Sequence, residues 1–150
     1  MSEIDQITDR ILQELLRDGR ISNTDLSARV GLSPSACLRR VQELERRGVI
    51  KGYRAVLDRD ALDRSFVAYL TVGLSNHTKI VREGFERAMA RAPQVVECHG
   101  ITGAVEYLLR VEVADLVAYK QFHTDIVGSL PHVQSLTSYI VVDSAKDDRA

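Results

Sequence analysis

Apolar residues in the first third of the chain recur every three or four positions, which is the spacing of a helix that buries one face. The first stripe consists of Ile4, Ile7, Ile11, Leu12, Leu15 and Leu16. A second helix is predicted over residues 23–31, because Ser22 and Asp25 have the spacing of a capping box. Its inward positions are Leu26 and Val30.

A third helix is predicted over residues 34–48. Ser33 is a favourable N-cap residue, and Pro34 suits the first helical position. The apolar stripe of this helix is Cys37, Leu38, Val41 and Leu44. Residues 49–57 are strand-like, with a possible turn at residues 51–52, so the first half is predicted to be three helices followed by a wing.

The second half of the chain has a different pattern. Four segments are strand-like in composition, at residues 66–74, 95–101, 107–113 and 133–142. Helical spacing marks residues 80–89, which end before Pro93, and residues 115–130, which end before Pro131. The order is βαββαβ, the split arrangement of ferredoxin-like domains, with both helices on one face of an antiparallel sheet. The other face is left bare, so we expect at least a dimer.

The predicted fold class is therefore α+β, with a winged helix-turn-helix followed by a ferredoxin-like βαββαβ domain. We expect a first domain at residues 1–53, with the helix-turn-helix at about residues 23–42, and a connector at residues 54–65. The second domain is expected at residues 66–143, with a tail at residues 144–150.

The positive charge of the chain is concentrated in its first half. The net charge of the whole chain is −1. Residues 1–54 carry a net charge of +2, the remainder carries −3, and residues 33–54 alone carry +4. Screening limits the field of a charge to about 8–10 Å at physiological salt, so phosphates respond to this local charge and not to the total.

Composition excludes several classes of protein. The chain is 45% hydrophobic and 27% charged, as in an ordinary globular protein. No apolar run approaches the length of a membrane span, and the acidic N-terminus does not resemble a signal peptide. Cys37 and Cys98 form neither a metal-binding spacing nor a disulfide framework, and we expect two buried thiols in a reducing cytoplasm.

The junction at residues 30–33 is a tight turn with a glycine and an inward leucine, which a helix-turn-helix requires. In that motif the second helix enters the major groove of double-stranded DNA. The candidate DNA-binding residues are Asn23, Thr24, Ser33, Ser35, Ala36, Arg39, Arg40, Arg46, Arg47 and Lys51. Ser33 also caps the helix, and Glu43 can pair with Arg39 or Arg40, so we expect at least one of these arginines to stay free. The alternative is a plain three-helix bundle with a solvated basic face.

Over residues 4–142 the chain resembles the Lrp/AsnC (leucine-responsive and asparagine-related) family of transcription regulators. The motifs that carry the resemblance are DGRISN at residues 18–23, VGLSPSACLRRV at 30–41, LERRGVIKGY at 44–53, VECH at 96–99, TG at 102–103 and EYLL at 106–109. The resemblance implies dimers that pair sheet to sheet and assemble into an octamer. It also implies that an amino acid binds between dimers.

The candidate effector-binding residues that this resemblance implies are Gly100, Ile101, Thr102, Gly103, Ala104, Val105, Glu106 and Tyr107. Backbone N–H groups at the glycines suit a carboxylate. Many relatives have Gly-Asp-x-Asp-Tyr where this chain has Gly103-Ala104-Val105-Glu106-Tyr107. The ammonium group of an amino acid would then need Glu106 or another acceptor, or the effector is not a simple amino acid. The alternative for Glu106 is a solvated turn carboxylate.

The leading hypothesis is a sequence-specific DNA-binding regulator that responds to an amino acid, works in the cytoplasm on the nucleoid, and needs neither a cofactor nor a metal. An architectural DNA-compacting protein of low sequence specificity is the main alternative. An enzyme built on the second half is the least favoured hypothesis. Cys98 and His99 are neighbours on a predicted strand, so they point to opposite faces and do not form a nucleophile and base.

Overall fold

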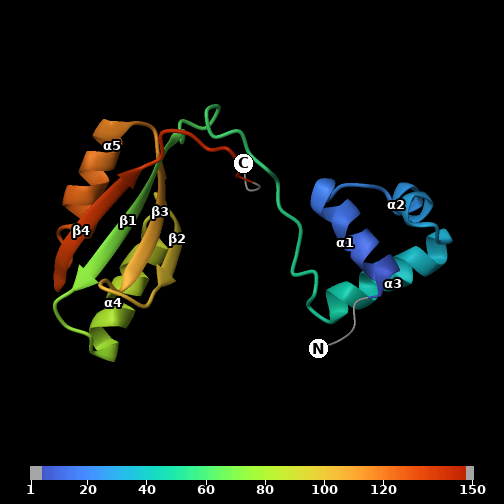
Figure 1. The fold of residues 1–150 in the computed structure, drawn as a ribbon, viewed down its shortest axis with the longest axis horizontal. Coiled ribbons are helices and arrows are strands. Elements are labelled where there is room, and N and C mark those ends of the chain that lie inside the picture. Colours follow the sequence, from blue (N-terminus) through green and yellow to red (C-terminus); the bar gives the residue numbers. More distant parts are fainter. Residues whose placement is uncertain (1–4, 148–150) are drawn as a thin grey trace. The chain divides into compact units, whose positions relative to one another are not determined.

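The computed structural model of the protein describes residues 5–147 and divides into two compact units, residues 1–55 and 56–150 (Figure 1). The first unit has three helices, α1 (Gln6–Arg17), α2 (Asn23–Val30) and α3 (Pro34–Arg46). None of the helices in residues 5–147 combines the length and the apolar content that crossing a bilayer requires.

Each helix of the first unit begins at a side-chain cap. The Asp5 carboxylate accepts the backbone N–H of Thr8 at 2.7 Å, before α1. The Ser22 hydroxyl accepts the N–H of Asp25 at 3.0 Å, before α2, which confirms Ser22 as the cap; the Asp25 carboxylate accepts from the Ser22 hydroxyl at 2.8 Å and not from its backbone N–H as in a full capping box. The Ser33 hydroxyl accepts the N–H of Ala36 at 3.3 Å, before α3. These bonds satisfy N–H groups that a helix cannot pair internally.

The core of the first unit follows the predicted stripes with two exceptions. Its buried residues are Ile11, Leu26, Val30, Cys37 and Leu44. Leu16 is 79% exposed and Leu38 is 45% exposed, although the sequence placed both on buried faces. Each of them directly follows an inward position, and one residue along a helix turns the side chain by about 100°.

The strands expected over residues 49–57 do not form. Residues 51–58 have no regular secondary structure, and the described part of the chain places no strand before β1 (Phe66–Leu74). A strand is stable only when another segment takes up its backbone hydrogen bonds. Among the described residues of this unit, the backbone hydrogen bonds at the start of the segment run from Val49 and Ile50 to the carbonyl of Leu44, at the end of α3.

The second unit is built on a four-stranded antiparallel sheet with the order β2-β3-β1-β4 (Figure 1). The other strands are β2 (Val95–Gly100), β3 (Tyr107–Val113) and β4 (Val133–Ile140). β1 lies inside the sheet, with Leu70 opposite Leu109 on β3 and opposite Ser138 on β4. The predicted βαββαβ order is therefore confirmed, although β2 and β4 are slightly shorter than expected.

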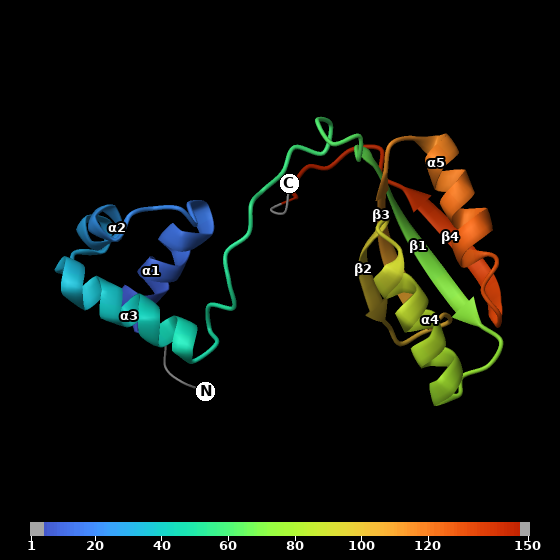
Figure 2. The ribbon, with the colours of Figure 1, turned by 180° about the vertical axis from the view of Figure 1, so that it is seen from behind.

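Two helical segments pack on one face of this sheet, as Figure 2 shows for α4 (Lys79–Arg91). The second segment begins as α5 (Leu116–Gln121) and continues as a π-helix, η1 (Phe122–Val127). The core joins alternate residues of the strands to the helices: Ala68, Leu70, Val72, Leu74, Leu109, Val111, Phe85, Met89, Tyr119, Phe122 and Val127. Ile80, Leu116 and Val117 were expected in the helical stripes and are exposed, because they lie on the outward sides of their helices.

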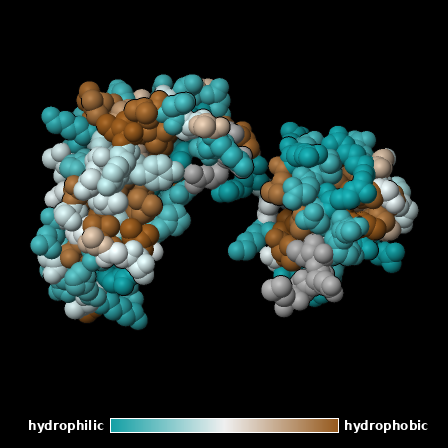
Figure 3. All heavy atoms as spheres, viewed as in Figure 1, coloured by the Kyte–Doolittle hydropathy of each residue, from teal (hydrophilic) through white to brown (hydrophobic). Residues whose placement is uncertain are grey.

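The opposite face of the sheet carries a cluster of charged groups. Arg110 is 5% exposed and donates to the Tyr69 hydroxyl at 2.7 Å, to Glu112 at 3.0 Å and to Asp147 at 2.9 Å. Arg59, from the connector, pairs with the same two carboxylates. The tail that leaves β4 is thereby held against the sheet together with the connector. On the face of this unit that Figure 3 shows, apolar residues and residues of near-neutral hydropathy lie among hydrophilic ones.

We expect Asp147→Ala to lower the free energy of unfolding by about 1–3 kcal/mol, because both guanidinium groups lose a charge-assisted hydrogen bond in a largely buried cluster. Urea denaturation of the full chain measures this change. Asp143→Ala is the control, because Asp143 is an exposed residue of the same tail that accepts a bond from the adjacent Ser144 N–H. Equal losses in the two variants would contradict a specific role for Asp147.

Candidate nucleic-acid interface and effector loop

The turn between α2 and α3 is held by a side chain that was predicted to bind DNA. The Asn23 amide donates to the carbonyl of Pro34 at 2.8 Å, across the turn. Gly31 ends α2 with φ at +74°, a conformation that glycine adopts without strain. Asn23 therefore fixes the angle between the two helices, while its neighbour Thr24 is exposed.

The face of α3 that points away from the core is exposed and polar. Cys37 and Leu44 point into the core. Four exposed residues at helical spacing lie opposite them: Ser35, Arg39, Gln42 and Arg46. Sequence reasoning missed Gln42, although its spacing from Arg39 and its amide group, which suits an adenine edge, were available as a signal. Leu38 flanks this face and adds an exposed apolar group beside it.

The arginines of α3 differ in what they bind. Arg40 pairs with both Asp5 oxygens, at 2.8 and 2.6 Å, and with the Thr8 hydroxyl at 2.9 Å. The Thr8 N–H and the Arg40 guanidinium lower the pKa of the Asp5 carboxyl to about 2, so this pair remains charged at neutral pH. Arg46 makes two hydrogen bonds to Glu43, at 2.8 and 2.6 Å.

Arg39 is the arginine of this face that stays free. It makes no ion pair or hydrogen bond with its side chain in residues 5–147. We expected one of Arg39 and Arg40 to stay free, and Arg39 does so among the described residues. Glu43 pairs with Arg46, not with Arg39 or Arg40. The pairing of Arg40 was not predicted, because Asp5 lies thirty-five positions away in sequence.

The remaining candidate DNA-binding residues have varied surroundings. Ser33 is used as the N-cap of α3, and its hydroxyl lies 3.4 Å from that of Ser35. Ala36 is half-buried at the side of the helix. Arg47 and Lys51 follow the end of α3, and both are exposed. The basic residues therefore continue beyond the helix into the segment that follows it.

The loop between β2 and β3 holds the candidate effector residues in a defined conformation. The Ile101 N–H donates to the Glu106 carbonyl at 2.9 Å, and the Glu106 N–H donates to the Val72 carbonyl at 3.0 Å. Gly103 lies at the tip with φ at +140°, and no heavy atom beyond its chain neighbours lies within 4 Å of the position that a Cβ would take. Ile101, Thr102 and Ala104 are exposed. The loop is thus anchored at its base and open at its tip.

Glu106 is an anchored carboxylate. One oxygen accepts the backbone N–H of Leu74 at 2.6 Å, and the other lies 3.2 Å from the His77 ring nitrogen. Its side chain is 20% exposed. This geometry does not match a freely solvated turn carboxylate. A ligand ammonium group would approach a carboxylate that already has two partners.

Tyr107 and Gly100 form the inner end of the loop. The Tyr107 side chain is buried, and its hydroxyl donates to Glu86 at 2.7 Å. Burial, followed by the hydrogen bond to Glu86, raises the pKa of Tyr107. Arg82 of α4 donates to the same hydroxyl at 3.3 Å. The Tyr107 side chain is therefore buried and held in place beside the base of the loop.

Cys98 and His99 do not work together. In the sheet Cys98 lies opposite Leu109, which faces the helices, and His99 lies opposite Leu108 on the other face. Cys98 is exposed, which corrects the expectation of a buried thiol: β2 is the edge strand, and α4 covers it incompletely. Partial desolvation raises the pKa of the Cys98 thiol, so it stays protonated at neutral pH. His99 pairs with Glu97 at 3.2 Å.

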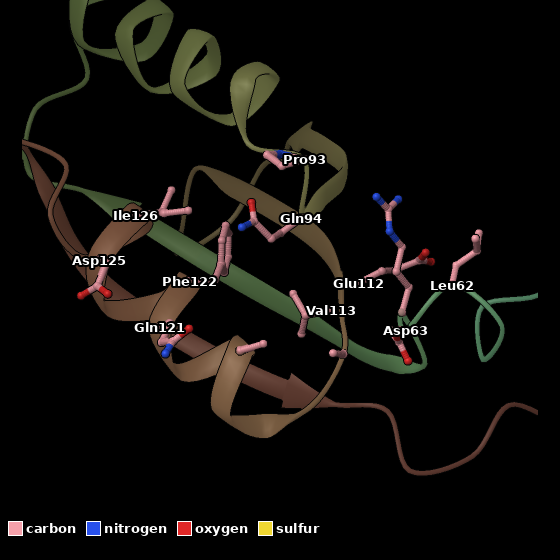
Figure 4. Close-up of a pocket in the computed structure, with 13 residues that line it drawn as sticks. Leu62, Asp63, Pro93, Gln94, Glu112, Val113, Gln121, Phe122, Asp125 and Ile126 are labelled. Carbon is pink, nitrogen blue, oxygen red and sulfur yellow. The ribbon is translucent and has the colours of Figure 1, made fainter.

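A shallow cleft of about 430 Å³ lies at the other end of β3 from the loop. Figure 4 shows it between the start of β2, with Pro93 and Gln94, and the side chains of Phe122 and Ile126. None of the candidate effector residues lines it. In the described residues, no group of three or more His, Cys, Asp and Glu side chains is placed to hold a metal ion.

Two family models match the chain in succession. A winged helix-turn-helix DNA-binding model matches residues 4–51, and the Lrp/AsnC ligand-binding domain matches residues 67–150. The leucine-responsive regulatory protein of Escherichia coli K12 is 40% identical over 144 residues, which cover 96% of this chain and 88% of the relative.

Solved structures are similar over nearly the full length. A transcriptional regulator from Neisseria meningitidis, in complex with L-Met, has a TM-score of 0.92 and 34% identity over 97% of this chain and 94% of its own. A feast or famine regulatory protein from Mycobacterium tuberculosis, complexed with L-methionine, has a TM-score of 0.83 and 28% identity over 99% and 98% of the two chains.

Proposed function

This chain belongs to the Lrp/AsnC family of transcription regulators, and we propose that it reads DNA with the exposed face of α3 and responds to an amino acid bound at residues 100–107. One observation carries this proposal. A DNA-binding domain and a Lrp/AsnC ligand-binding domain follow each other in one chain, which is 40% identical to a leucine-responsive regulator over 144 residues. The order matches a protein that converts ligand binding into a change in DNA binding.

We propose that Arg39 makes the main sequence-specific contact of α3. Its guanidinium is exposed and unpaired among the described residues, so it is available for the two acceptors of a guanine edge. Gln42, on the same face, is suited to adenine, and the Ser35 hydroxyl to a phosphate or a base edge. Arg40 contributes less, because Asp5 neutralises it. Arg47 and Lys51 are placed to bind phosphates, with Thr24 beside the turn.

We propose that the effector is an amino acid with an apolar side chain. The two similar structures with bound methionine support this class. The loop of this chain has Ala104 and Val105 between Gly103 and Glu106, so its tip offers methyl groups and backbone N–H groups and no carboxylate before Glu106. The glycines let a carboxylate approach the backbone closely.

We propose that the unit acts as a dimer, which pairs through the outer face of the sheet and assembles further into an octamer. The outer positions include Thr71, Leu108, Thr137 and Tyr139, and Tyr139 is 57% exposed in the single chain. An effector that binds one arrangement of subunits better than another shifts the population toward it and so changes how DNA is engaged.

We further propose that the protein works by binding alone, on the nucleoid, without turnover of a substrate. Membership of a family of regulators supports this. Cys98 and His99, the pair that most resembles a nucleophile and base, lie on opposite faces of the sheet. Turnover of an amino acid by the purified protein would contradict it.

We expect Arg39→Ala to weaken binding to the protein's own promoter by about 1–3 kcal/mol and to relax base preference at one position. Arg40→Ala should weaken binding less, and equally for all sequences. Fluorescence anisotropy at fixed salt measures both variants on promoter and random DNA. Arg17→Ala, on the exposed side of α1, is the control for a lost surface charge. If both α3 variants bind promoter DNA with wild-type affinity, the exposed face of α3 is not the surface that contacts DNA.

Comparable affinity of the wild-type protein for promoter and random DNA, at the same salt concentration, would instead favour the architectural alternative.

We expect Gly103→Val to abolish the response to the effector and leave DNA binding intact. Valine is strained at φ +140°, and its side chain occupies the open tip of the loop. The measurement is promoter binding with and without the amino acid that most raises the thermal midpoint. A response equal to that of the wild type would place the effector site elsewhere.

We expect residues 56–150, expressed alone, to be dimeric or larger at micromolar concentration. The fragment keeps Arg59 and Asp147, which complete the charged cluster. Light scattering measures its mass, and a stable monomer would contradict pairing through the sheet.

A further inference from the structure

A cationic side chain lies beside the loop at residues 101–106, although it comes from a different part of the sequence. Arg82 is exposed on α4. Its Nη2 atom lies 3.5 Å from the position that a Cβ would occupy at Gly100, the residue that precedes the loop. Figures 1 and 2 both show the chain between β2 and β3 passing close to α4. Helix and loop thus meet at Gly100.

The guanidinium of Arg82 is fixed in place by an aromatic side chain. Its Nε donates to the Tyr107 hydroxyl at 3.3 Å, and its central carbon lies 5.7 Å from the centre of the Tyr107 ring. Tyr107 is itself buried and held by Glu86. An arginine held in this way has already lost much of its rotational freedom, so binding a ligand costs it less entropy.

The outer nitrogens of this guanidinium remain available. Only Nε is engaged by Tyr107, and the Arg82 side chain makes no ion pair within residues 5–147. Carboxylates bind arginine through two parallel N–H bonds from one edge of the guanidinium. Gly100 presents only its backbone to Nη2, so no side chain at this position competes with a ligand for the guanidinium.

We propose that Arg82 binds the carboxylate of the effector beside Gly100, at the base of the loop. The proposal rests on the proposed function and deepens it. Glu106, whose carbonyl accepts the Ile101 N–H at the base of the loop, supplies the opposite charge. The base of the loop therefore carries both a cation and an anion, the two charges that a zwitterionic amino acid requires. Beside the backbone N–H groups of the loop, Arg82 gives the carboxylate a charged partner and gives the ligand an orientation.

The test compares ligands with and without the carboxylate on the full chain. Isothermal titration calorimetry at pH 7 measures the Kd of L-methionine and of L-methioninamide, which keeps the ammonium and the side chain. Wild type should prefer L-methionine. Arg82→Gln should weaken L-methionine binding by about tenfold to a hundredfold, the range for a charged hydrogen bond, and should bind the amide as wild type does. Loss of this discrimination is a readout that a purely structural role would not produce.

Two further variants sharpen the result. Gly100→Ala places a methyl group 3.5 Å from Nη2, at a backbone conformation without positive φ, and should weaken L-methionine more than the amide. Arg87→Gln removes an exposed arginine from the same helix and should change neither Kd. Thermal unfolding of each variant confirms that the domain is folded.

If Arg82→Gln prefers L-methionine over L-methioninamide as strongly as wild type does, this proposal is wrong. The proposed function as an amino-acid-responsive regulator would not be affected by that result. Absence of binding by wild type to L-methionine and to the other nineteen amino acids would overturn it together with the proposed effector class. The proposal that α3 binds DNA would still be tested separately, by the Arg39→Ala and Arg40→Ala variants.

Discussion

The central position of β1 is the constraint on which the second unit depends. Because β1 is hydrogen-bonded to β3 on one side and β4 on the other, its residues alternate strictly between the two faces of the sheet. Leu70 and Val72 face the helices, while Tyr69 faces the other side and accepts a bond from Arg110. The same strand ends in the groups that anchor Glu106. One strand thus positions the core, the charged cluster and the effector loop.

In the first unit, function depends on which charges are already neutralised. Asp5 caps α1 and also pairs with Arg40, so one carboxylate stabilises a helix and removes a positive charge from the neighbouring helix. Glu43 neutralises Arg46 of the same helix, one turn away. On the exposed face of α3, Arg39 remains for contacts with bases, with Ser35 and Gln42 on either side, and Arg47 and Lys51 remain for phosphates. The pairing of charges within the protein therefore concentrates its recognition of DNA on few groups.

Features that depend on neighbours in sequence were predictable, and features that depend on distant contacts were not. The caps at Ser22 and Ser33 and the βαββαβ order follow from local spacing, and the structure confirms them. The resemblance pointed to the loop at residues 100–107. By contrast, the pairing of Arg40 with Asp5 and the approach of Arg82 to Gly100 join segments far apart in sequence. Helical spacing also cannot decide how wide a buried stripe is, which is why Leu38 was misplaced.

The strand order has a consequence for how the protein behaves when it is handled or destabilised. β2 and β4 are the two edges of the sheet, and each presents backbone groups that no strand of its own unit satisfies. β2 is protected by a register shift between Val95 and Glu97 and by the glutamate itself. β4 reads VQSLTSYI and has no charged residue over its whole length. Self-association into extended sheets would therefore start at β4, because an edge strand without charged residues lacks the repulsion that keeps other strands from pairing with it.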